Sequence, residues 1–292
     1  MKQNEYSTVA RVLITCQDKP GIIAKVTTFL KNHGANITDL DQHSTDPEGG
    51  TFFMRLEFQT PHVDISSKKL EQSFAEEVAK PFKMEWQIHY AKQIKRMAIF
   101  VSKYDHALLE ILWRWSRQEL PMEIPFIISN HADLKQASEN FNVPFYHIPV
   151  TSDTKKIAEE KILNLCEKKV DGIILARYMQ ILSEDFTHHY PHKIINIHHS
   201  FLPAFMGANP YQQAYDKGVK LIGATAHYVT KDLDMGPIIS QDVVRVSHRL
   251  NPQELRILGQ TVERNVLARA IKAHLEDRII VDGTKTIVFE NH

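Results

Sequence analysis

The sequence contains little cysteine and no excess of charge of either sign. Its two cysteines, Cys16 and Cys166, form no C-x-x-C pair, which argues against a disulfide framework or a cysteine zinc site and predicts a reduced, cytoplasmic protein. The 35 Lys and Arg residues equal the 35 Asp and Glu residues in number, whereas a nucleic-acid-binding protein normally has a basic excess. No apolar run approaches the roughly 18 residues of a membrane span, and the polar start, Met1 to Thr8, lacks the apolar segment of a signal peptide. We therefore expect no nucleic-acid partner and no membrane partner.

Several common catalytic motifs are also absent. No G-x-G-x-x-G occurs, so the usual dinucleotide-binding fingerprint is missing. Residues 218–225 have the glycine spacing of a phosphate-binding loop, but Ala224 stands where the lysine is needed. The G-x-S-x-G elbow of serine hydrolases is absent as well. Nucleotide chemistry and serine nucleophilic catalysis are therefore weakly supported.

The 292 residues are enough for two domains, and the pattern of the chain changes near residue 90. The first part alternates predicted strands and amphipathic helices in the order βαββαβ, which is the ferredoxin-like arrangement. Gly34 stands where a left-handed helix cap belongs. The predicted strands are Val9–Thr15, Ile37–His43, Phe52–Phe58 and Phe82–His89, and the predicted helices are Ile22–His33 and Ile65–Ala79.

Residues 91–96 are polar without periodicity and form the expected linker, so we expect domains at residues 1–90 and 97–292. After the linker, apolar strands alternate with helices, which predicts a Rossmann-like, doubly wound α/β sheet. The longest predicted helix, Pro252–Leu275, has Asn251 as its N-cap. The predicted strands are Met97–Val101, Ile124–Ile128, Phe145–Ile148, Gly172–Ala176 and Ile194–Ile197, followed by a hairpin of Leu221–Val229 and Pro237–Val246.

Two polar residues end the predicted strand that begins at Ile194. The alternation of a strand puts Asn196 and His198 on the same face, with Ile197 on the opposite face. In an open parallel sheet, ligands bind beyond the carboxyl ends of the strands, which is where this pair belongs. An amide that stabilises an oxyanion beside an imidazole that moves a proton suits acyl or formyl transfer. The alternative is that both residues are ordinary polar side chains at a strand end.

A second candidate group lies in the predicted hairpin. Asp234 stands in the turn before Gly236 and Pro237, and a carboxylate there can approach His198 and orient its ring. His227 on the preceding strand is a possible additional site residue. The alternative is an ordinary aspartate in a β-turn, where aspartate is common.

Histidines are numerous, with 16 in the chain and a cluster between residues 188 and 199. His188, His189 and His192 follow a predicted helix end, and they belong to no H-E-x-x-H motif. No cysteine and no closely spaced pair of acidic residues completes a ligand set. We expect solvated histidines here and no metal site.

With these motifs in view, the second part of the chain resembles the folate-dependent formyltransferase family. The resemblance rests on N-I-H-x-S-x-L-P-x-F-x-G at residues 196–207 and on L-D-x-G-P-I-I at residues 233–239. It implies a catalytic trio of Asn196, His198 and Asp234. A third matching segment, A-R-Y-M-Q-I-L at residues 176–182, implies that the folate pteridine lies against Tyr178, Met179, Gln180, Ile181 and Leu182.

The formyl acceptor is indicated by finer differences within that family. Glycinamide ribonucleotide formyltransferases carry a glycine-serine-asparagine turn after the first strand, whereas residues 102–106 here lack the glycine that lets backbone amides approach a phosphate. The runs at residues 177–180 and 203–211 resemble instead the formyltetrahydrofolate deformylase family, whose acceptor is water.

The first part of the chain resembles the ACT domain, through D-K-P-G-I-I-A at residues 18–24 and G-A-N-I at residues 34–37. A loop before a helix offers free amides to a carboxylate, so Asp18, Pro20, Gly21 and Ile22 form a possible amino-acid effector loop. The alternative is that this domain only builds an oligomer. The resemblance suggests methionine and glycine as effectors and a homo-oligomeric assembly.

Taken together, the resemblances imply hydrolysis of 10-formyltetrahydrofolate to formate and tetrahydrofolate, with no cofactor beyond the folate substrate. They imply a supply of formate for purine synthesis and a balance of one-carbon folates. Two alternatives stay open: a formyltransferase to an amine acceptor such as glycinamide ribonucleotide, and a sensor that keeps the fold without the activity. A sensor, however, has no reason to keep all three residues of the trio.

Overall fold

The computed structural model describes residues 8–46, 48–202 and 209–290, which form two compact units. The first unit contains the chain up to Ile94 together with Glu276–Ile280 and the end of the chain from Ile287. The second unit contains Lys95–Leu275 together with Val281–Thr286. In the part of the chain that the structure describes, no helix combines the length and the apolar character that crossing a bilayer requires.

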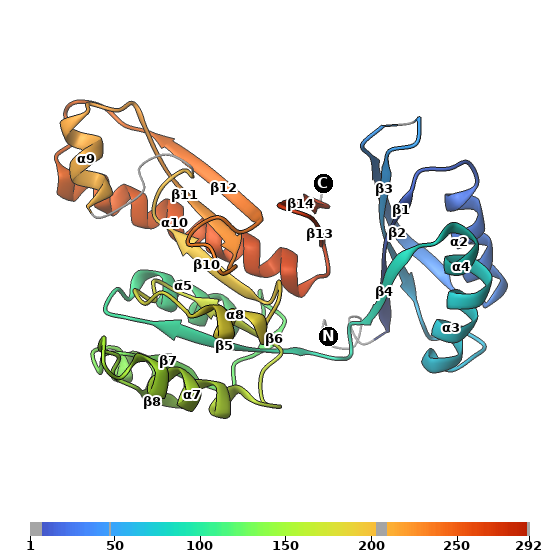
Figure 1. Cartoon of the computed structure of the whole chain (residues 1–292), viewed down its shortest axis with the longest axis horizontal. Helices are drawn as coiled ribbons and strands as arrows, with labels where there is room; N and C mark the ends of the chain where they lie inside the picture. Colours follow the sequence, from blue (N-terminus) through green and yellow to red (C-terminus); the bar gives the residue numbers. More distant parts are fainter. Residues whose placement is uncertain (1–7, 47, 203–208, 291–292) are drawn as a thin grey trace. The chain divides into compact units, whose positions relative to one another are not determined.

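The first unit is an antiparallel sheet of four strands in the order β2-β3-β1-β4, with its helices on one face (Figure 1). This is the ferredoxin-like βαββαβ fold that the sequence predicts. Its elements are β1 (Val9–Gln17), α2 (Ile22–Asn32), β2 (Asn36–Ser44), β3 (Thr51–Gln59), α3 (Ser67–Phe74), the π-helical η1 (Ala75–Ala79), α4 (Lys80–Phe82) and β4 (Glu85–Tyr90).

Alternation along β1 creates the core of this unit. Val12 and Ile14 point to the helical face, where they join Val26 of α2 and Phe74 of α3 in one buried cluster. The expected left-handed cap follows α2, because Gly34 has φ +76° and its amide donates to the carbonyl of Lys31 at 3.0 Å.

The opposite face of this sheet is covered by the end of the chain. Leu13 and Phe53 on that face form an apolar cluster with Phe289, which is buried. Arg11 donates from Nε to Glu57 at 3.0 Å and lies 3.4 Å from Asp277. The expected division at 97–292 assigned all of these C-terminal residues to the second domain. It differs from the structure because the apolar outer face of the first unit is buried by residues distant in sequence.

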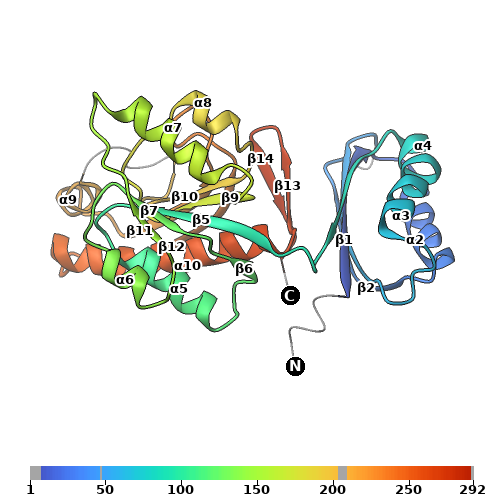
Figure 2. The same ribbon diagram turned by 90° about the horizontal axis from the view of Figure 1, so that it is seen from below.

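The second unit is a sheet of mixed direction in the order β12-β11-β10-β9-β5-β7-β8, with β6 beside β5. The strands from β10 to β8 run parallel, whereas β11 and β12 form the predicted antiparallel hairpin. Helices α5 and α10 cover one face, and α7 and α8 cover the other (Figure 2). The strands are β5 (Lys95–Val101), β6 (Met122–Glu123), β7 (Ile127–Ser129), β8 (Phe145–His147), β9 (Gly172–Leu175), β10 (Ile194–His198), β11 (Leu221–Tyr228) and β12 (Ile238–Arg245).

The helices of this unit alternate with its strands as the sequence predicts, and the long helix begins and ends at the predicted residues, but one helix was missed. They are α5 (His106–Ser116), α6 (Lys135–Glu139), α7 (Lys155–Cys166), α8 (Glu184–His188), α9 (Pro210–Asp216) and α10 (Pro252–Leu275), and α9 was not predicted. Asn251 caps α10 as expected, because its Oδ1 accepts from the amides of Gln253 at 2.9 Å and Glu254 at 3.0 Å. Two short strands near the C-terminus, β13 (Ile279–Asp282) and β14 (Lys285–Val288), were also missed. The expected linker at 91–96 is shorter, since β5 begins at Lys95.

Candidate active site

The strand order of the second unit reverses between β5 and β9, so the topological switch point of the sheet lies at the carboxyl ends of these two strands. From β5 the chain first adds β7 and β8 on one side and then returns to add β9 and β10 on the other. Ligands of open α/β sheets bind at such a reversal. Ser102 follows β5, Arg177 follows β9, and His198 ends β10 at this edge.

The structure brings Asn196, His198 and Asp234 together and adds His227 to them. His198 Nδ1 lies 3.1 Å from Asp234 Oδ2, and His227 Nε2 lies 3.5 Å from Asp234 Oδ1. Asn196 Nδ2 lies 3.2 Å from His227 Nε2. The four polar side chains therefore form one continuous chain of contacts from Asn196 to His198.

Strand pairing and a strained turn explain this convergence. Asn196 pairs directly with His227 in the antiparallel ladder of β10 and β11, and on the other side of β11 the pairing with β12 shifts register between Ala226 and His227. Asp234 has φ +55°, a left-handed conformation that aspartate tolerates better than most residues. At Gly236, an added Cβ would lie 1.7 Å from the carbonyl oxygen of Tyr228, so the turn that carries Asp234 requires glycine there.

The electrostatics of the group favour an ionised Asp234. Burial acts to raise the pKa of Asp234, but hydrogen bonds from His198 and His227 outweigh burial and lower the pKa well below its usual range. A permanently charged carboxylate is thus held between two imidazoles.

The other nitrogen of His198 points away from this carboxylate contact. Because a carboxylate only accepts hydrogen bonds, Nδ1–H of His198 donates to Asp234 and leaves Nε2 with a lone pair in the neutral ring. Nε2 is buried and has no hydrogen-bond partner among the described residues. An imidazole that is oriented by a carboxylate and has a free second nitrogen is the arrangement of a general base.

His227 is positioned by its own backbone contact. Its Nδ1–H donates to the carbonyl of Tyr228 at 3.0 Å, so Nε2 is the atom that faces Asn196 and Asp234. In the neutral ring Nε2 accepts from the amide of Asn196, and in the charged ring it donates to Asp234. Either contact supports the prediction that His227 is an additional residue of this site.

The segment expected to contact the folate is divided by the structure into buried and exposed side chains. Tyr178 and Leu182 belong to the hydrophobic core, whereas Met179 and Ile181 are 55% and 58% exposed and Gln180 is half-buried. The amide of Met179 donates to Ser102 Oγ at 2.9 Å, which ties this segment to the end of β5. Only part of the predicted surface is therefore accessible to a ligand.

A cavity of about 460 Å³ lies beside this segment, and Met179 lines it together with His199, the residue that follows His198. The ring of His199 lies 4.9 Å from that of His198, centroid to centroid. Burial, followed by the positive charge of Arg177, lowers the pKa of His199 to about 4, so this ring is neutral at pH 7.

The sequence analysis missed four residues that meet beside this cavity: His106, Arg177, Tyr211 and Glu263. Glu263 is 1% exposed and falls in the apolar stripe of α10, in step with Leu255 and Gly259. A carboxylate at a core position of a helix is the signal that could have revealed the group.

The other expected residues give a mixed outcome. Residues 203–208, which carry part of the expected formyltransferase motif, lie outside the described residues. Of the histidine cluster, His188 ends α8, and His189 Nδ1 donates to the carbonyl of Asp185 at 2.8 Å. Among the residues with a described position, no group of three His, Cys, Asp or Glu side chains is arranged to hold a metal ion.

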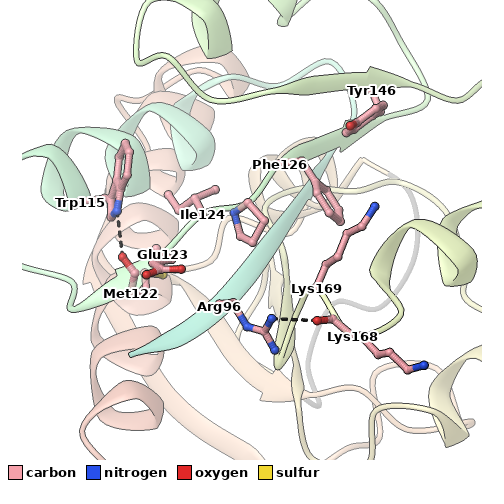
Figure 3. Close-up of a pocket in the computed structure, with 10 residues that line it drawn as sticks. Arg96, Trp115, Met122, Glu123, Ile124, Phe126, Tyr146, Lys168 and Lys169 are labelled. Carbon is pink, nitrogen blue, oxygen red and sulfur yellow. Dashed lines mark hydrogen bonds between the residues drawn. The ribbon is translucent and has the colours of Figure 1, made fainter. Parts of the chain in front are cut away.

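A larger hollow of about 580 Å³ lies at the opposite end of the sheet (Figure 3). Arg96 at the start of β5 and Phe126 just before β7 line it, and Arg96 donates to the carbonyl of Lys168 at 2.8 Å. Since this hollow lies at the amino ends of the strands, it is separate from the trio.

The expected effector loop of the first unit begins α2. Gly21 has φ +93° and caps the helix without a side-chain hydrogen bond, and Asp18 accepts a hydrogen bond from Ser44 at 2.6 Å. Pro20 and Gly21 are exposed, whereas Ile22 is buried. The loop thus leaves the first amides of α2 without a side-chain cap.

Comparison with known proteins first defines the class. Residues 95–271 match the Formyl transferase family, and residues 10–73 match the ACT domain family. The catalytic unit is therefore a formyl transferase domain that follows an ACT domain.

Longer matches define the particular family. Over 280 residues the chain is 53% identical to formyltetrahydrofolate deformylase from Bacillus subtilis (strain 168), which covers 96% of this chain and 93% of that protein. The protein of the same name from Escherichia coli (strain K12) is 38% identical over 291 residues, which cover 97% of this chain and 99% of that protein. The crystal structure of a formyltetrahydrofolate deformylase from Pseudomonas syringae pv. tomato superposes with a TM-score of 0.93 at 44% identity, covering 99% and 98% of the two chains. The chain belongs to the formyltetrahydrofolate deformylase family, whose members are hydrolases.

Formyltransferases that act on glycinamide ribonucleotide match less of the chain. The transformylase structure from Symbiobacterium toebii superposes with a TM-score of 0.64 at 27% identity, covering 68% of this chain and 95% of that one.

Proposed function

We propose that this enzyme hydrolyses 10-formyltetrahydrofolate to formate and tetrahydrofolate. The observation that carries the proposal is His198 Nε2, which has no partner among the described residues; its ring is oriented through Nδ1 by Asp234, and Asn196 joins the same group through His227. A base, its orienting carboxylate and an amide donor are the groups that acyl hydrolysis requires.

In the proposed reaction, water attacks the formyl carbon and gives its proton to His198 Nε2. Asn196 donates a hydrogen bond to the formyl oxygen as that oxygen becomes negative in the tetrahedral intermediate. The bond from carbon to N10 then breaks and His198 returns the proton to N10, which releases tetrahydrofolate and formic acid. The formic acid loses its proton to solvent and is the formate product. Asp234 keeps the ring of His198 in the required tautomer and stabilises its charged form.

A second role to consider for Asp234 is direct activation of the water. Both oxygens of Asp234 already lie within 3.5 Å of an imidazole nitrogen. This geometry favours the orienting role, and direct activation stays a prediction.

For the folate, we propose that the accessible Met179 and Ile181 contact the pteridine, with Gln180 at the same surface. Tyr178 and Leu182 support them from the core beneath, so they act on binding through packing. Substituting Met179 should therefore raise KM, whereas substituting Leu182 should lower stability.

Water is proposed as the acceptor because residues 102–106 lack the glycine turn that a nucleotide phosphate requires, and because the full-length relatives carry the deformylase name. The test is to incubate the pure protein with 10-formyltetrahydrofolate alone and with added glycinamide ribonucleotide. Formate release without the amine supports hydrolysis. Turnover that depends on the amine supports the formyltransferase alternative.

No metal or other cofactor enters the proposed mechanism. Dialysis against a chelator should leave formate release unchanged. A loss of activity that added zinc or iron restores would show that the mechanism needs a metal.

The ACT domain suggests that the protein binds an amino acid, and we propose that methionine or glycine binds at the loop of Asp18, Pro20, Gly21 and Ile22 in a homo-oligomer. The uncapped start of α2 supports a carboxylate there. Titration of each amino acid into the full-length enzyme, followed by turnover and light scattering, tests both parts.

We further propose a cytoplasmic location and a role in supplying formate for purine synthesis and balancing one-carbon folates. Rescue of a deletion strain by added formate tests that role.

A further inference from the structure

The cavity beside His199 contains a buried cation that no part of the proposed mechanism uses. Arg177 follows β9 and lines the cavity together with Tyr104, Met179, His199 and Tyr211. Only 10% of its side chain is exposed, and its guanidinium lies 5.3 Å from the centroid of the Tyr104 ring. A buried guanidinium needs a reason to be there, because burying charge is costly.

The backbone of Arg177 is in a conformation that favours glycine. Its φ is +63°, in the left-handed region, which costs a residue with a Cβ about 1 kcal/mol or more. Arg177 lines the cavity, and its carbonyl accepts from the amide of Ser102 at 3.3 Å.

The guanidinium of Arg177 is paired in charge with Glu263 but forms no hydrogen bond to the residues that the structure describes. Its Nε lies 3.6 Å from Glu263 Oε2, too far for a hydrogen bond, and Nε has no hydrogen-bond partner within the described residues. A guanidinium carries five N–H donors, and its fork matches the two oxygens of a carboxylate. The hydrogen-bonding capacity of Arg177 is therefore available to a ligand.

Glu263 is the group that holds Arg177 in this position. It accepts hydrogen bonds from Tyr211 Oη at 2.7 Å and from His106 Nε2 at 2.9 Å, so its own oxygens are satisfied. Burial acts to raise the pKa of Glu263, but the contacts with His106, Arg177 and Tyr211 outweigh it and lower the pKa. The ionised Glu263 balances the charge of Arg177 without using its donors.

We propose that Arg177 binds a small carboxylate in this cavity, namely the formate that the reaction releases. The inference rests on the proposed function, since formate is its product. His199 is next to both places: the centroid of its ring lies 4.9 Å from that of the His198 ring, and His199 lines the cavity with Arg177. The cavity thus combines the positive charge of Arg177 with the hydrogen-bonding ring of His199, and in the proposal formate leaves the reaction centre through this site.

The test measures formate binding directly, without turnover. ¹³C-formate is titrated into the full-length protein in the absence of folate, and binding is followed by broadening of the formate NMR signal at constant ionic strength. Arg177→Gln should weaken formate binding at least tenfold, and Arg177→Lys should be intermediate because it keeps the charge but loses the fork. Arg264→Gln is the control, because it makes the same change in charge at the residue that follows Glu263 in the sequence. Arg264 donates a hydrogen bond to Thr261 on α10 and does not line the cavity.

Product inhibition gives a second measurement on the same proteins. The inhibition constant of formate should rise at least tenfold in Arg177→Gln and stay unchanged in Arg264→Gln. Formate binding that is equal in all variants, or chloride that competes as well as formate, would overturn the proposal. The proposal would also be overturned if Arg177→Gln raised KM for the folate more than it raised the inhibition constant of formate. Arg177 would then bind a carboxylate of the folate tail.

The binding titration separates this inference from the proposed function. If the protein binds formate through Arg177 but releases none from 10-formyltetrahydrofolate, the proposed function fails and the anion site stands. If hydrolysis occurs and the Arg177 variants bind formate normally, the anion site fails alone.

Discussion

At the residue scale, the site depends on a carboxylate between two imidazoles. Asp234 contacts His198 and His227 from a left-handed turn position. Asn196 approaches the same group through His227. Each polar side chain thus fixes the next, and Nε2 of His198, which has no partner among the described residues, is the atom that we propose acts on the substrate.

Asp234→Asn should remove most of the turnover while leaving the fold and folate binding intact. Asparagine is similar in size and tolerates the left-handed backbone, but it carries no charge to orient and stabilise His198. We expect kcat to fall by about 10²–10⁴, the usual contribution of a general acid–base group. Stopped-flow measurement of tetrahydrofolate formation checks this. Asp232→Asn, which makes the same change at an exposed residue of this turn, is the matched control. A near-normal kcat in Asp234→Asn would show that Asp234 has no part in the mechanism.

His199 should make the second unit less stable at acidic pH. In the folded protein its pKa is lowered to about 4, mainly by burial, whereas the unfolded chain takes up the proton near the ordinary value of 6.5. Between these two values the unfolded state binds more protons, so stability should fall as the pH drops from about 6.5 to about 4. His199→Gln should lose less stability than the wild type over this window. Urea unfolding midpoints at pH 7 and pH 4.5 measure it, and parallel losses in both proteins would contradict the assignment to His199.

The trio could be predicted from the sequence because its residues lie in short motifs at strand ends. Asn196 and His198 share a strand face, and Asp234 stands in a hairpin turn next to that strand. Arg177, Tyr211 and Glu263 could not be predicted in the same way. Their contacts join the end of β9 to α9 and α10, which are distant in the chain, and no local pattern specifies which buried polar groups meet.

At the scale of elements, α10 packs closely against Tyr211 of α9 at Gly259. An added Cβ at Gly259 would lie 2.0 Å from Tyr211 Oη and 2.4 Å from two ring carbons of Tyr211. The ring is buried and rigid, so it cannot move aside cheaply. A glycine in the middle of this long helix is therefore explained by the tyrosine that reaches Glu263.

Gly259→Ala should destabilise the protein despite the higher helix propensity of alanine. Alanine gains up to about 1 kcal/mol in a helix interior. Overpacking a core typically costs about 1–3 kcal/mol, and the displaced Tyr211 also loses its hydrogen bond to Glu263. We expect a net loss of about 1–2 kcal/mol, measured by chemical unfolding. Thr261→Ala at an exposed position of α10 should show no such loss, and a stabilised Gly259→Ala variant would contradict the packing argument.

The elements that could be predicted are those with clear periodicity, such as β1, α2 and the capped α10. The missed elements are short: α9 has 7 residues, and β13 and β14 have 4 each. Segments of this length carry less than two periods of a helix or a few alternations of a strand, so packing decides their structure. The mixed direction of the sheet follows from the hairpin of β11 and β12, which the sequence did indicate.

At the scale of the whole molecule, the end of the chain completes the first unit. Phe289 is 4% exposed and packs against Leu13 and Phe53 on the sheet face opposite the helices. Alternation alone marks Leu13 and Phe53 as residues of an outer face. That this face is buried by residues near 289 depends on a contact across almost the entire chain, which the sequence does not indicate.

Phe289→Ala should loosen β1 and β3 selectively. Truncation of a buried phenylalanine costs about 3–5 kcal/mol, and the loss falls on the sheet that Phe289 covers. Amide hydrogen exchange should become faster in Val9–Gln17 and Thr51–Gln59. Phe201→Ala, at a residue that is 42% exposed, is the control and should leave exchange in these strands unchanged. Unchanged exchange in Phe289→Ala would show that the chain end does not stabilise this sheet.

The central claim is that water is the formyl acceptor, and isotope labelling tests it most directly. The full-length protein is incubated in H₂¹⁸O with 10-formyltetrahydrofolate as the only organic substrate, and the formate is analysed by mass spectrometry. Hydrolysis through His198 predicts one ¹⁸O atom in each formate and one tetrahydrofolate for each formate released. No formate in the absence of an amine, or formate without the label, would contradict the account.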